Sequence, residues 1–514
     1  MPHMRFSSIL YIILSLWVGQ LSCKAQVTER ATAFTDKDCY VVGERMHVRV
    51  NLTDESGKQP SNISRVAYVE VADTASLQAQ AMVLLEGGQG WADIALPTTM
   101  HSGYYMLSVY SRQMINQGAE TFHRQLIGVV NPMHVTRRDA IKYHTPTEGE
   151  AQVRSYSPGQ MISVGVPSVI QTLSVERDPL AIQGYDAPSA RLTNKKNIPA
   201  IPEVEGHIVV ASTSTNTETQ KVMLAGVGKG SFLVDGQAYN DSLWCFYTHD
   251  MAGNLPIIAY ASNDNGSVPV QLQSPYVTVL PKALPTLDVW CTEDALLRRA
   301  QGADEEATIS HWAEADTIKY SLEFLEQQPD RFYNMDEYTN FSTIREAMVE
   351  FINGVTRRSV QGVVSLFTPD ANTGIYSKFP ALVLLDGMPV YDIDKIMKYD
   401  ARLLNYIQIY NGVYTFGSTT VHGVISFISR RGLLSNFQID EKAQLARYAF
   451  PQDHPQFVIA NTPHTSTCIW QPKVNASRAE FKAPLQPGRY LVTLQGIDNN
   501  GERFKSTQWI EVKE

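Results

Sequence analysis

The chain has 514 residues, of which 44% are hydrophobic and 18% are charged. This composition is typical of folded globular proteins, and the length predicts about three to five domains of roughly 100–200 residues each. The formal net charge is −9, and no basic run is present that would neutralise phosphates. The balance of charge therefore argues against nucleic-acid binding.

The N-terminus has the pattern of a secretory signal. Residues 9–19 (ILYIILSLWVG) form an apolar run that is too short for a membrane-spanning helix of about 20 residues. Its length suits the apolar core of a signal peptide, so residues 1–25 are predicted to be removed after Ala25. Lipidation of Cys23 is the alternative, although Gln20 stands where lipoprotein signals usually carry Leu. Either route predicts an exported protein of the periplasm or outer membrane.

The mature chain would keep four widely scattered cysteines, which are Cys39, Cys245, Cys291 and Cys468. Their spacing matches neither a disulfide framework nor a metal-binding C-x-x-C pattern. We expect buried small apolar side chains, while a disulfide remains open in an oxidising compartment.

Short alternating strands dominate the first half of the chain. Residues 45–51 (RMHVRVN) and 103–110 (GYYMLSVY) alternate apolar and polar side chains, and Gly-, Asn- and Asp-rich turns separate such runs. This texture favours antiparallel β-sandwiches. Composition shifts then predict a first sandwich, a second β domain, a third sandwich and a last sandwich, over residues 26–132, 133–200, 201–280 and 436–514.

Residues 281–435 differ in texture and predict a helical segment followed by an α+β domain. Thr343 and Glu346 make a capping box at the start of a helix, and Gly354 is placed to end it. Asp386-Gly387 favours a type I′ turn between strands at 381–385 and 388–391, because that turn needs positive φ at both central positions.

Four motifs in order over residues 341–430 resemble the plug domain of TonB-dependent outer-membrane receptors. They are TIREAMVEFINGV, LVLLDGMPVYD, LLNYIQIYNGVYTFGS and VHGVISFISRRG. A receptor also needs a barrel of about 22 strands after its plug, and the residues after Arg430 are too few for it. The resemblance therefore implies a plug-like domain without a barrel, which excludes active import by this chain alone.

The other domains resemble macroglobulin-type (MG/Ig-like) domains. FTDKDCYVVGERMHVRVNL and LPTTMHSGYYMLSVYSR carry the resemblance in the first sandwich, and residues 202–235 and 436–514 look similar in kind. None of the cysteines lies in the C-G-E-Q pattern that a macroglobulin thioester needs. The combination resembles exported proteins of Bacteroidetes-type bacteria, and it implies location and architecture more than activity.

A search for catalytic patterns finds little. The sequence contains no H-E-x-x-H, G-x-S-x-G or phosphate-loop motif, and AGVGKGSF at 225–232 reads as a hairpin turn. Asp392 and Asp394 lie at a predicted helix start, where capping explains them better than paired catalysis. His123, His134 and His144 read as strand or surface histidines rather than metal ligands, and 313–327 reads as a solvated helix. No catalytic, cofactor or metal residue is predicted.

The sequence thus predicts a multidomain, mainly β, non-enzymatic scaffold that docks through its plug-like domain to an outer-membrane β-barrel or another envelope protein. It would touch the membrane only peripherally or by a lipid anchor. The predicted contact residues lie at the hairpin and at a later turn: Leu385, Asp386, Gly387, Met388, Pro389, Val390, Tyr391, Tyr414, Phe416 and Gly417. A glycan- or peptide-binding accessory protein of an uptake system, using WCFY at 244–247 or Tyr104-Tyr105, is the alternative. An enzyme with an unrecognised site is a further rival.

Overall fold

The computed structural model describes residues 28–133, 139–146, 153–199, 201–214, 219, 221–228, 231–249, 251–263, 266–313, 325, 327–338, 341–360, 362–417, 419–432, 434–456, 464–498 and 500–513. The predicted signal segment 1–25 with Cys23, His134 and most of 313–327 lie outside these ranges. The fold is mainly β with several antiparallel sheets, as predicted. Among the described helices, none has the length and apolar character needed to cross a bilayer.

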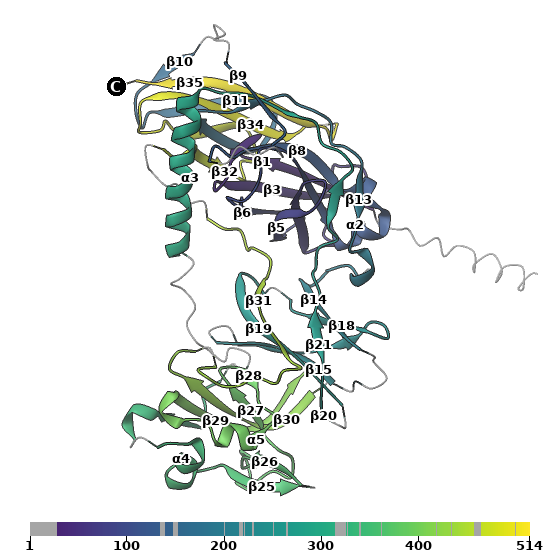
Figure 1. The fold of residues 1–514 in the computed structure, drawn as a ribbon, viewed down its shortest axis with the longest axis vertical. Coiled ribbons are helices and arrows are strands. Elements are labelled where there is room, and N and C mark those ends of the chain that lie inside the picture. The colour runs from purple at the N-terminus through teal and green to yellow at the C-terminus, as the bar shows by residue number, and fades with distance from the viewer. Residues whose placement is uncertain are drawn as a thin grey trace, which may run out of the picture.

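The molecule is elongated, with three lobes along its long axis (Figure 1). We call residues 28–199, 279–303 and 464–513 the upper lobe. The middle lobe comprises residues 201–272 and 444–449, and the lower lobe comprises residues 331–439. The chain leaves the upper lobe through the long helix α3 (Glu293–Ala313) and returns to it after the lower lobe. The lower lobe is therefore an insertion between two parts of the upper lobe.

The N-terminal part of the upper lobe is a two-sheet sandwich. One sheet has the order β1-β3-β6 and the other β2-β8-β7-β4-β5. Their alternating side chains bury a core that includes Met46, Val48 and Val50. A short helix α2 (Arg112–Gln117) is capped by Ser111, whose hydroxyl accepts a hydrogen bond from the Met114 backbone N–H. The strands are β1 (Glu29–Thr35), β2 (Cys39–Val41), β3 (Arg45–Asp54), β4 (Val66–Ala72), β5 (Leu77–Leu84), β6 (Gln89–Ala95), β7 (Gly103–Ser111) and β8 (His123–Val130).

Strands from residues 133–200 are shared among several sheets. β11 (Met161–Arg177) lies inside a sheet whose other strands, except one, come from the C-terminal fifty residues. Those partners are β32 (Thr467–Gln471), β33 (Ala476–Lys482), β34 (Gly488–Ile497) and β35 (Arg503–Val512), and β10 (Arg154–Tyr156) completes the edge. Alternation of apolar and polar side chains identifies a strand, but its pairing partner depends on residues far away in the sequence.

The remaining strands of 133–200 pair with the segment that follows the middle lobe. β9 (Ile141–His144) and β12 (Ala181–Ile182) flank β23 (Leu287–Trp290), and β13 (Ala190–Leu192) pairs with β22 (Val279–Pro281). These small sheets join the first sandwich to the start of α3. The predicted domain boundaries themselves remain a prediction.

The middle lobe consists of two further sheets. One has the order β17-β18-β14-β21, and the other joins β16, β15, β19 and β20. β31 (Gln444–Ala449) pairs with β19 here, although it lies in the stretch expected to form the last sandwich. The remaining strands are β14 (Ile208–Thr213), β15 (Lys221–Gly226), β16 (Leu233–Asp235), β17 (Gln237–Ala238), β18 (Leu243–Tyr247), β19 (Asn254–Asn263), β20 (Gly266–Val268) and β21 (Val270–Leu272).

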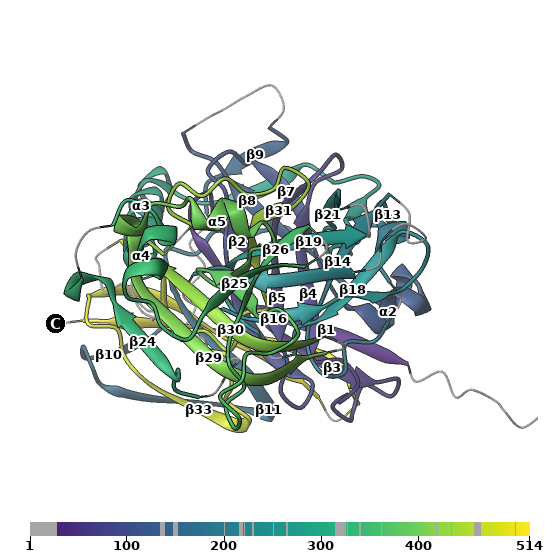
Figure 2. The same ribbon diagram turned by 90° about the horizontal axis from the view of Figure 1, so that it is seen from below.

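The lower lobe has the predicted α+β character. Its main sheet has the order β24-β29-β30-β27-β28, with β27 parallel to β30, and Figure 2 shows β24, β29 and β30 side by side. The strands are β24 (Arg331–Asn334), β27 (Leu382–Leu385), β28 (Met388–Pro389), β29 (Leu404–Phe416) and β30 (Thr419–Ser429). A separate hairpin pairs β25 (Thr356–Val360) with β26 (Val363–Phe367). Two short helices, α4 (Ile344–Glu350) and α5 (Ile393–Met397), complete the lobe.

The predicted capping of α4 is present in a modified form. The Thr343 hydroxyl accepts a hydrogen bond from the Glu346 N–H at 3.2 Å, as a capping box requires. The Glu346 carboxylate instead accepts from the N–H and hydroxyl of Ser342, at 3.0 and 2.7 Å. The helix ends at Glu350, and Gly354 follows it with a φ of 83°.

The three lobes share their apolar cores. One buried cluster runs from the first sandwich into the middle lobe and includes Val109, Val209 and Phe246. A second runs from the opposite face of the middle lobe into the lower lobe and includes Met223 and Leu385. Because close-packed interiors resist deformation, these shared cores hold the lobes in a fixed arrangement.

Buried polar clusters reinforce the same joints. Between the upper and middle lobes, the Glu203 carboxylate accepts a hydrogen bond from the Tyr68 hydroxyl at 2.7 Å and pairs with Nδ1 of His207 at 2.9 Å. Nε2 of His207 contacts the Tyr448 hydroxyl of β31 at 2.7 Å. Burial lowers the pKa of His207, so the imidazole is neutral and serves as a structural link.

Candidate functional site

Among the described residues, no group of three or more His, Cys, Asp or Glu side chains is arranged to hold a metal ion. His144 pairs with Asp288 at 2.7 Å and His123 lies beside Gln125, so these two predicted strand histidines have local partners. All four cysteines in the described part of the chain are free thiols, two of them buried. Asp392 caps α5 by accepting from the Lys395 N–H at 3.0 Å, as predicted.

The Asp386-Gly387 turn has the predicted backbone conformation, with φ of 48° and 85°. The structure places it inside the molecule rather than on the surface. The Asp386 carboxylate accepts hydrogen bonds from the N–H and hydroxyl of Ser429, at 2.7 and 2.6 Å, and from the Leu434 N–H at 2.8 Å. The turn therefore fastens the end of β30 instead of pointing into solvent.

The same turn also closes the joint between the middle and lower lobes. The Gly228 N–H of the middle lobe donates to the Asp386 carbonyl at 2.8 Å. A Cβ atom on Gly387 would lie 2.4 Å from the Ser231 hydroxyl and 2.7 Å from the Gly226 carbonyl. Of the predicted hairpin contacts, residues 385–390 are buried, and only Tyr391 is accessible, with 41% of its surface exposed.

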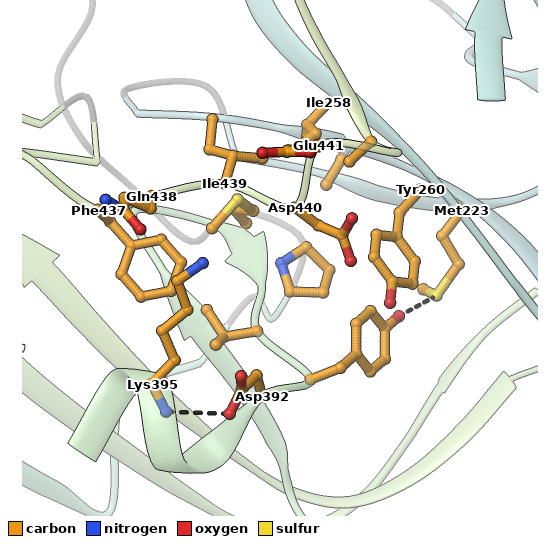
Figure 3. Close-up of a pocket in the computed structure, with 16 residues that line it drawn as sticks. Met223, Ile258, Tyr260, Asp392, Lys395, Phe437, Gln438, Ile439, Asp440 and Glu441 are labelled. Atoms are coloured by element: carbon orange, nitrogen blue, oxygen red, sulfur yellow. Dashed lines mark hydrogen bonds between the residues drawn. The ribbon is translucent and has the colours of Figure 1, made fainter. Parts of the chain in front are cut away.

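A cavity of about 280 Å³ lies beside this hairpin, at the joint (Figure 3). β15 and β19 of the middle lobe form one wall, and the hairpin with α5 forms another. The segment 437–443, which leads from the lower lobe to β31, closes the third side. We call this cavity the acidic pocket; its apolar lining includes Met223, Ile258, Met388, Val390 and Phe437, and its polar lining includes Tyr260, Tyr391, Asp392, Lys395, Asp440 and Glu441.

Two tyrosines form the aromatic part of the acidic pocket. The rings of Tyr260 and Tyr391 are stacked, with centroids 4.6 Å apart and planes inclined by 25°. The Tyr391 hydroxyl contacts the Met223 sulfur at 3.0 Å, which is a weak acceptor (Figure 3). Burial raises the pKa of both tyrosines, so both hydroxyls are neutral hydrogen-bond donors at physiological pH.

The charged lining of the acidic pocket is mainly negative. Three carboxylates (Asp392, Asp440 and Glu441) face one ammonium, that of Lys395, which lies 5.3 Å from the centroid of the Phe437 ring. Burial opposes ionisation of Asp440, but hydrogen bonds from Ser267 and the Lys442 N–H lower its pKa below the usual value. Asp440 is therefore charged at neutral pH, and the pocket suits a ligand that carries positive charge and apolar carbon.

A second cavity, of about 540 Å³, adjoins the acidic pocket, and we call it the apolar groove. It shares Met223, Val390 and Tyr391 with the acidic pocket. Its own lining comes from β26, β27, β30 and the loop before β27, and it includes Val363, Phe379, Pro380, Leu382 and Val421. The two cavities are neighbours along the joint, with Tyr391 in the wall between them.

The other predicted contact residues lie at the turn between β29 and β30. Phe416 is buried, while the Tyr414 hydroxyl donates to the Asn411 carbonyl at 3.0 Å. Gly417 lies against Asp235 of β16, which also accepts from the Thr419 hydroxyl at 3.0 Å. This turn thus makes a second contact with the middle lobe, and Ser418 lies outside the described residues.

Most of the aromatic residues considered for sugar stacking are core residues, and Tyr247 is half-buried. Trp244, Cys245 and Phe246 of the WCFY run are buried in the middle lobe, and Tyr104 and Tyr105 are buried in the upper lobe. Sequence reasoning missed the residues that do line a cavity, such as Tyr260, Phe437 and Asp440, because they come from β19 and from segment 437–443, which no sequence pattern links to the hairpin. Of the walls of the acidic pocket, only the hairpin was indicated by a sequence pattern.

Comparisons with known proteins give weak likenesses. No protein-family model matches the chain, and no curated protein matches it. Among solved structures, Salmonella alpha-2-macroglobulin reacted with methylamine aligns with a TM-score of 0.17 and 9% identity, over 94% of this chain and 23% of that one. Escherichia coli alpha-2-macroglobulin activated by porcine elastase gives 0.18 and 11%, over 95% and 31%. The Escherichia coli adhesin FdeC gives 0.16 and 11%, over 52% and 65%.

The chain spans about a quarter to a third of the length of those macroglobulins. TM-scores of this size do not establish a shared fold. The chain itself defines the class of protein as a mainly β, multi-sheet protein with one α+β lobe.

Proposed function

We propose that this protein is a non-enzymatic, exported scaffold of the bacterial cell envelope that binds a partner protein through its lower lobe. One observation carries the proposal: among the described residues, seven of the seventeen exposed large apolar side chains lie on the lower lobe, as many as on the upper lobe, which is more than twice as long. They are Phe332, Val349, Val363, Ile375, Phe379, Tyr391 and Val413. Exposed apolar groups that gather on one part of a soluble protein are typical of an interaction surface.

Three of these side chains, Val363, Phe379 and Val413, line two cavities that both include Phe379. Phe379 is 60% exposed and stacks on His422, with ring centroids 4.6 Å apart. Val413 lines the same small cavity as Phe379 and His422, and Val363 lines the apolar groove with Phe379. We call Val363, Phe379, Val413 and His422 the Phe379 patch. It replaces the buried Asp386-Gly387 turn as the contact surface that we propose.

The upper and middle lobes would act as rigid support for this surface, because their cores are continuous with each other and with the lower lobe. The signal-like N-terminus supports location in the envelope, and the plug-like motifs support an outer-membrane partner. Binding of a glycan or peptide ligand is a second function that the acidic pocket favours, since the pocket combines stacked tyrosines with carboxylates.

The test is affinity purification of the full chain from solubilised, cross-linked envelopes. We expect Phe379→Asp and Val413→Asp to lose the partner that wild type retains, because a charge at the centre of an apolar interface must be desolvated. Leu485→Asp is the matched control, since Leu485 is also 60% exposed but lies on the upper lobe. Recovery of the same proteins with all four chains would refute docking through this patch.

A further inference from the structure

We infer that the partner presents an extended segment in which one basic side chain enters the acidic pocket while neighbouring apolar side chains lie in the apolar groove. This inference rests on the proposed function and names the chemistry that the partner must offer. The adjacency of the two cavities, the charge of the first and the lining of the second support this inference.

The two cavities are adjacent because they share wall residues. Met223, Val390 and Tyr391 line both the 280 Å³ pocket and the 540 Å³ groove. One bound chain can therefore pass Tyr391 and place side chains on either side of it. Tyr391 keeps 41% of its surface exposed although its neighbours in the hairpin are buried, so a ligand can reach its ring.

Charge selects a basic side chain for the acidic pocket. The three carboxylates in its lining exceed the one ammonium there, and hydrogen bonds together with the nearby charges of Lys442 and Lys395 hold Asp440 in its charged form. Among the described residues, Glu441 has neither an ion pair nor a hydrogen bond to its carboxylate, so this charge is available to a ligand. Aromatic rings attract cations through their faces, and Lys395 already uses the face of Phe437 in this way at 5.3 Å. A lysine or arginine side chain also supplies the apolar stem that Met223 and Ile258 would cover.

The apolar groove selects side chains of a different kind. Val363, Phe379, Pro380 and Leu382 supply its apolar surface, and Lys221 and His422 are the side chains along it that carry or can take up positive charge. A second basic residue is therefore disfavoured there. An extended segment suits the surface, because residues of several strands, among them β26, β27 and β30, line the groove, so neighbouring side chains of one segment can each find a contact.

The test uses displayed random dodecapeptides selected against the full wild-type chain. We expect selected peptides to share one Lys or Arg next to apolar residues. Binding of the best peptide, measured by fluorescence anisotropy, should weaken at least ten-fold in the Asp440→Asn, Glu441→Gln double variant, which corresponds to about 1.4 kcal/mol. Replacing the basic residue of that peptide by norleucine should have a similar effect. Glu480→Gln, an exposed carboxylate on β33, is the matched control and should leave the affinity unchanged.

Several results would overturn the inference. They are failure to select any peptide, selection of peptides without a basic residue, and equal affinity for wild type and the double variant in chains with the same unfolding midpoint. Glycan binding that disappears in Tyr391→Ala would assign the pocket to a sugar instead. If the double variant still recovers the envelope partner that Phe379→Asp loses, the proposed function stands. The inference that this partner inserts a basic side chain is then refuted. If Phe379→Asp also keeps the partner, the proposed function fails by itself.

Discussion

Glu176 is a buried carboxyl group that shares the guanidinium of Arg299 with a second buried carboxylate, that of Glu44. Its side chain lies 3.0 Å from Nη1 of Arg299, while Glu44 accepts from Nε and Nη2 of that guanidinium at 2.8 and 2.7 Å. Burial raises the pKa of Glu176 to about 7, although Arg299 opposes the shift. Burial acts on Glu44 too, but Arg299 and Lys37 outweigh it and lower the pKa of Glu44 to about 2.

The upper lobe should therefore lose stability as pH rises from about 4.5 to about 7. The pKa of Glu176 in the folded protein lies above its ordinary value of 4.5, so the folded state binds more protons than the unfolded state in this window. Glu176→Gln removes this proton uptake and should flatten the decline, by at most about 3 kcal/mol. Urea unfolding at several pH values measures the effect, with Glu480→Gln as control. Parallel curves for wild type and Glu176→Gln would contradict it.

At the level of single residues, the sequence predicts local conformation well and contacts poorly. The positive φ at Asp386 and Gly387 follows from residue chemistry alone, and so does the capping role of Asp392. The three donors to the Asp386 carboxylate come from Ser429 and Leu434, which no local pattern connects to the turn. Exposure of a turn is decided by what packs over it, and that information is not local.

Helix α3 is anchored to the upper lobe by one of two adjacent arginines. Arg299 is buried and also donates to the Cys39 carbonyl at 3.0 Å, whereas Arg298 pairs with Asp178 at 2.9 Å and stays 41% exposed in its side chain. Gly302 lies so close to the His464 carbonyl that a Cβ atom there would be 2.2 Å away. The first part of α3 is thus fixed to the upper lobe by the buried charge of Arg299 and by the close contact of Gly302 with the His464 backbone.

Removing Arg299 should release this helix. We expect Arg299→Ala to lower the free energy of unfolding by about 3–5 kcal/mol, because Glu44 would be left buried without its main counter-charge. Arg298→Ala removes a similar side chain whose ion pair is partly solvated, so it should cost less than about 1 kcal/mol. Chemical unfolding gives both values, and hydrogen exchange over 293–303 locates the change. Equal losses in the two variants would refute the anchoring role.

At the level of elements, alternation located strands but not their partners. Residues 45–51 lie within β3 and 103–110 nearly coincide with β7, as predicted. β11 and β31 were expected in other neighbourhoods, and both pair with strands far away in the chain. Alternation shows that a segment is a strand but not which strand it will pair with, so the choice of partner depends on the shape of the whole core.

Taken as a whole, the molecule depends on a tight joint at Gly387. This residue has a φ of 85°, and the middle lobe leaves no space for a Cβ atom beside it. The acidic pocket and the apolar groove both lie along this joint. Movement of the lower lobe away from the middle lobe would therefore open both cavities at once.

Gly387→Ala should loosen the joint. The added methyl group meets the Gly226 carbonyl and the Ser231 hydroxyl, so we expect a loss of about 2 kcal/mol or more and a larger radius of gyration by X-ray scattering. Gly374→Ala is the matched control, because Gly374 has a φ of 68° with no atom within 4 Å of a Cβ. It carries the backbone strain without the clash. A radius of gyration that is equal in both variants would show that the joint does not depend on this contact.

The candidate site could be predicted only in part. The hairpin 381–391 was expected to matter, and Val390 and Tyr391 do line both cavities, but the role of Tyr391 follows from Tyr260 stacking on it. Tyr260 lies in another lobe, and Asp440 lies in a segment that the sequence assigned to the last sandwich. A site at a joint between lobes cannot be predicted until the relative positions of the lobes are known.

The central position of β11 has a consequence for how the protein is made. Both long edges of this strand are completed by segments at the end of the chain, β34 on one side and β32 with β33 on the other. Synthesis proceeds from the N-terminus, so β11 emerges well before any of them. Until those later strands have been made, its unpaired amides and carbonyls can pair with the wrong neighbours, and a chaperone would protect the polypeptide at this stage.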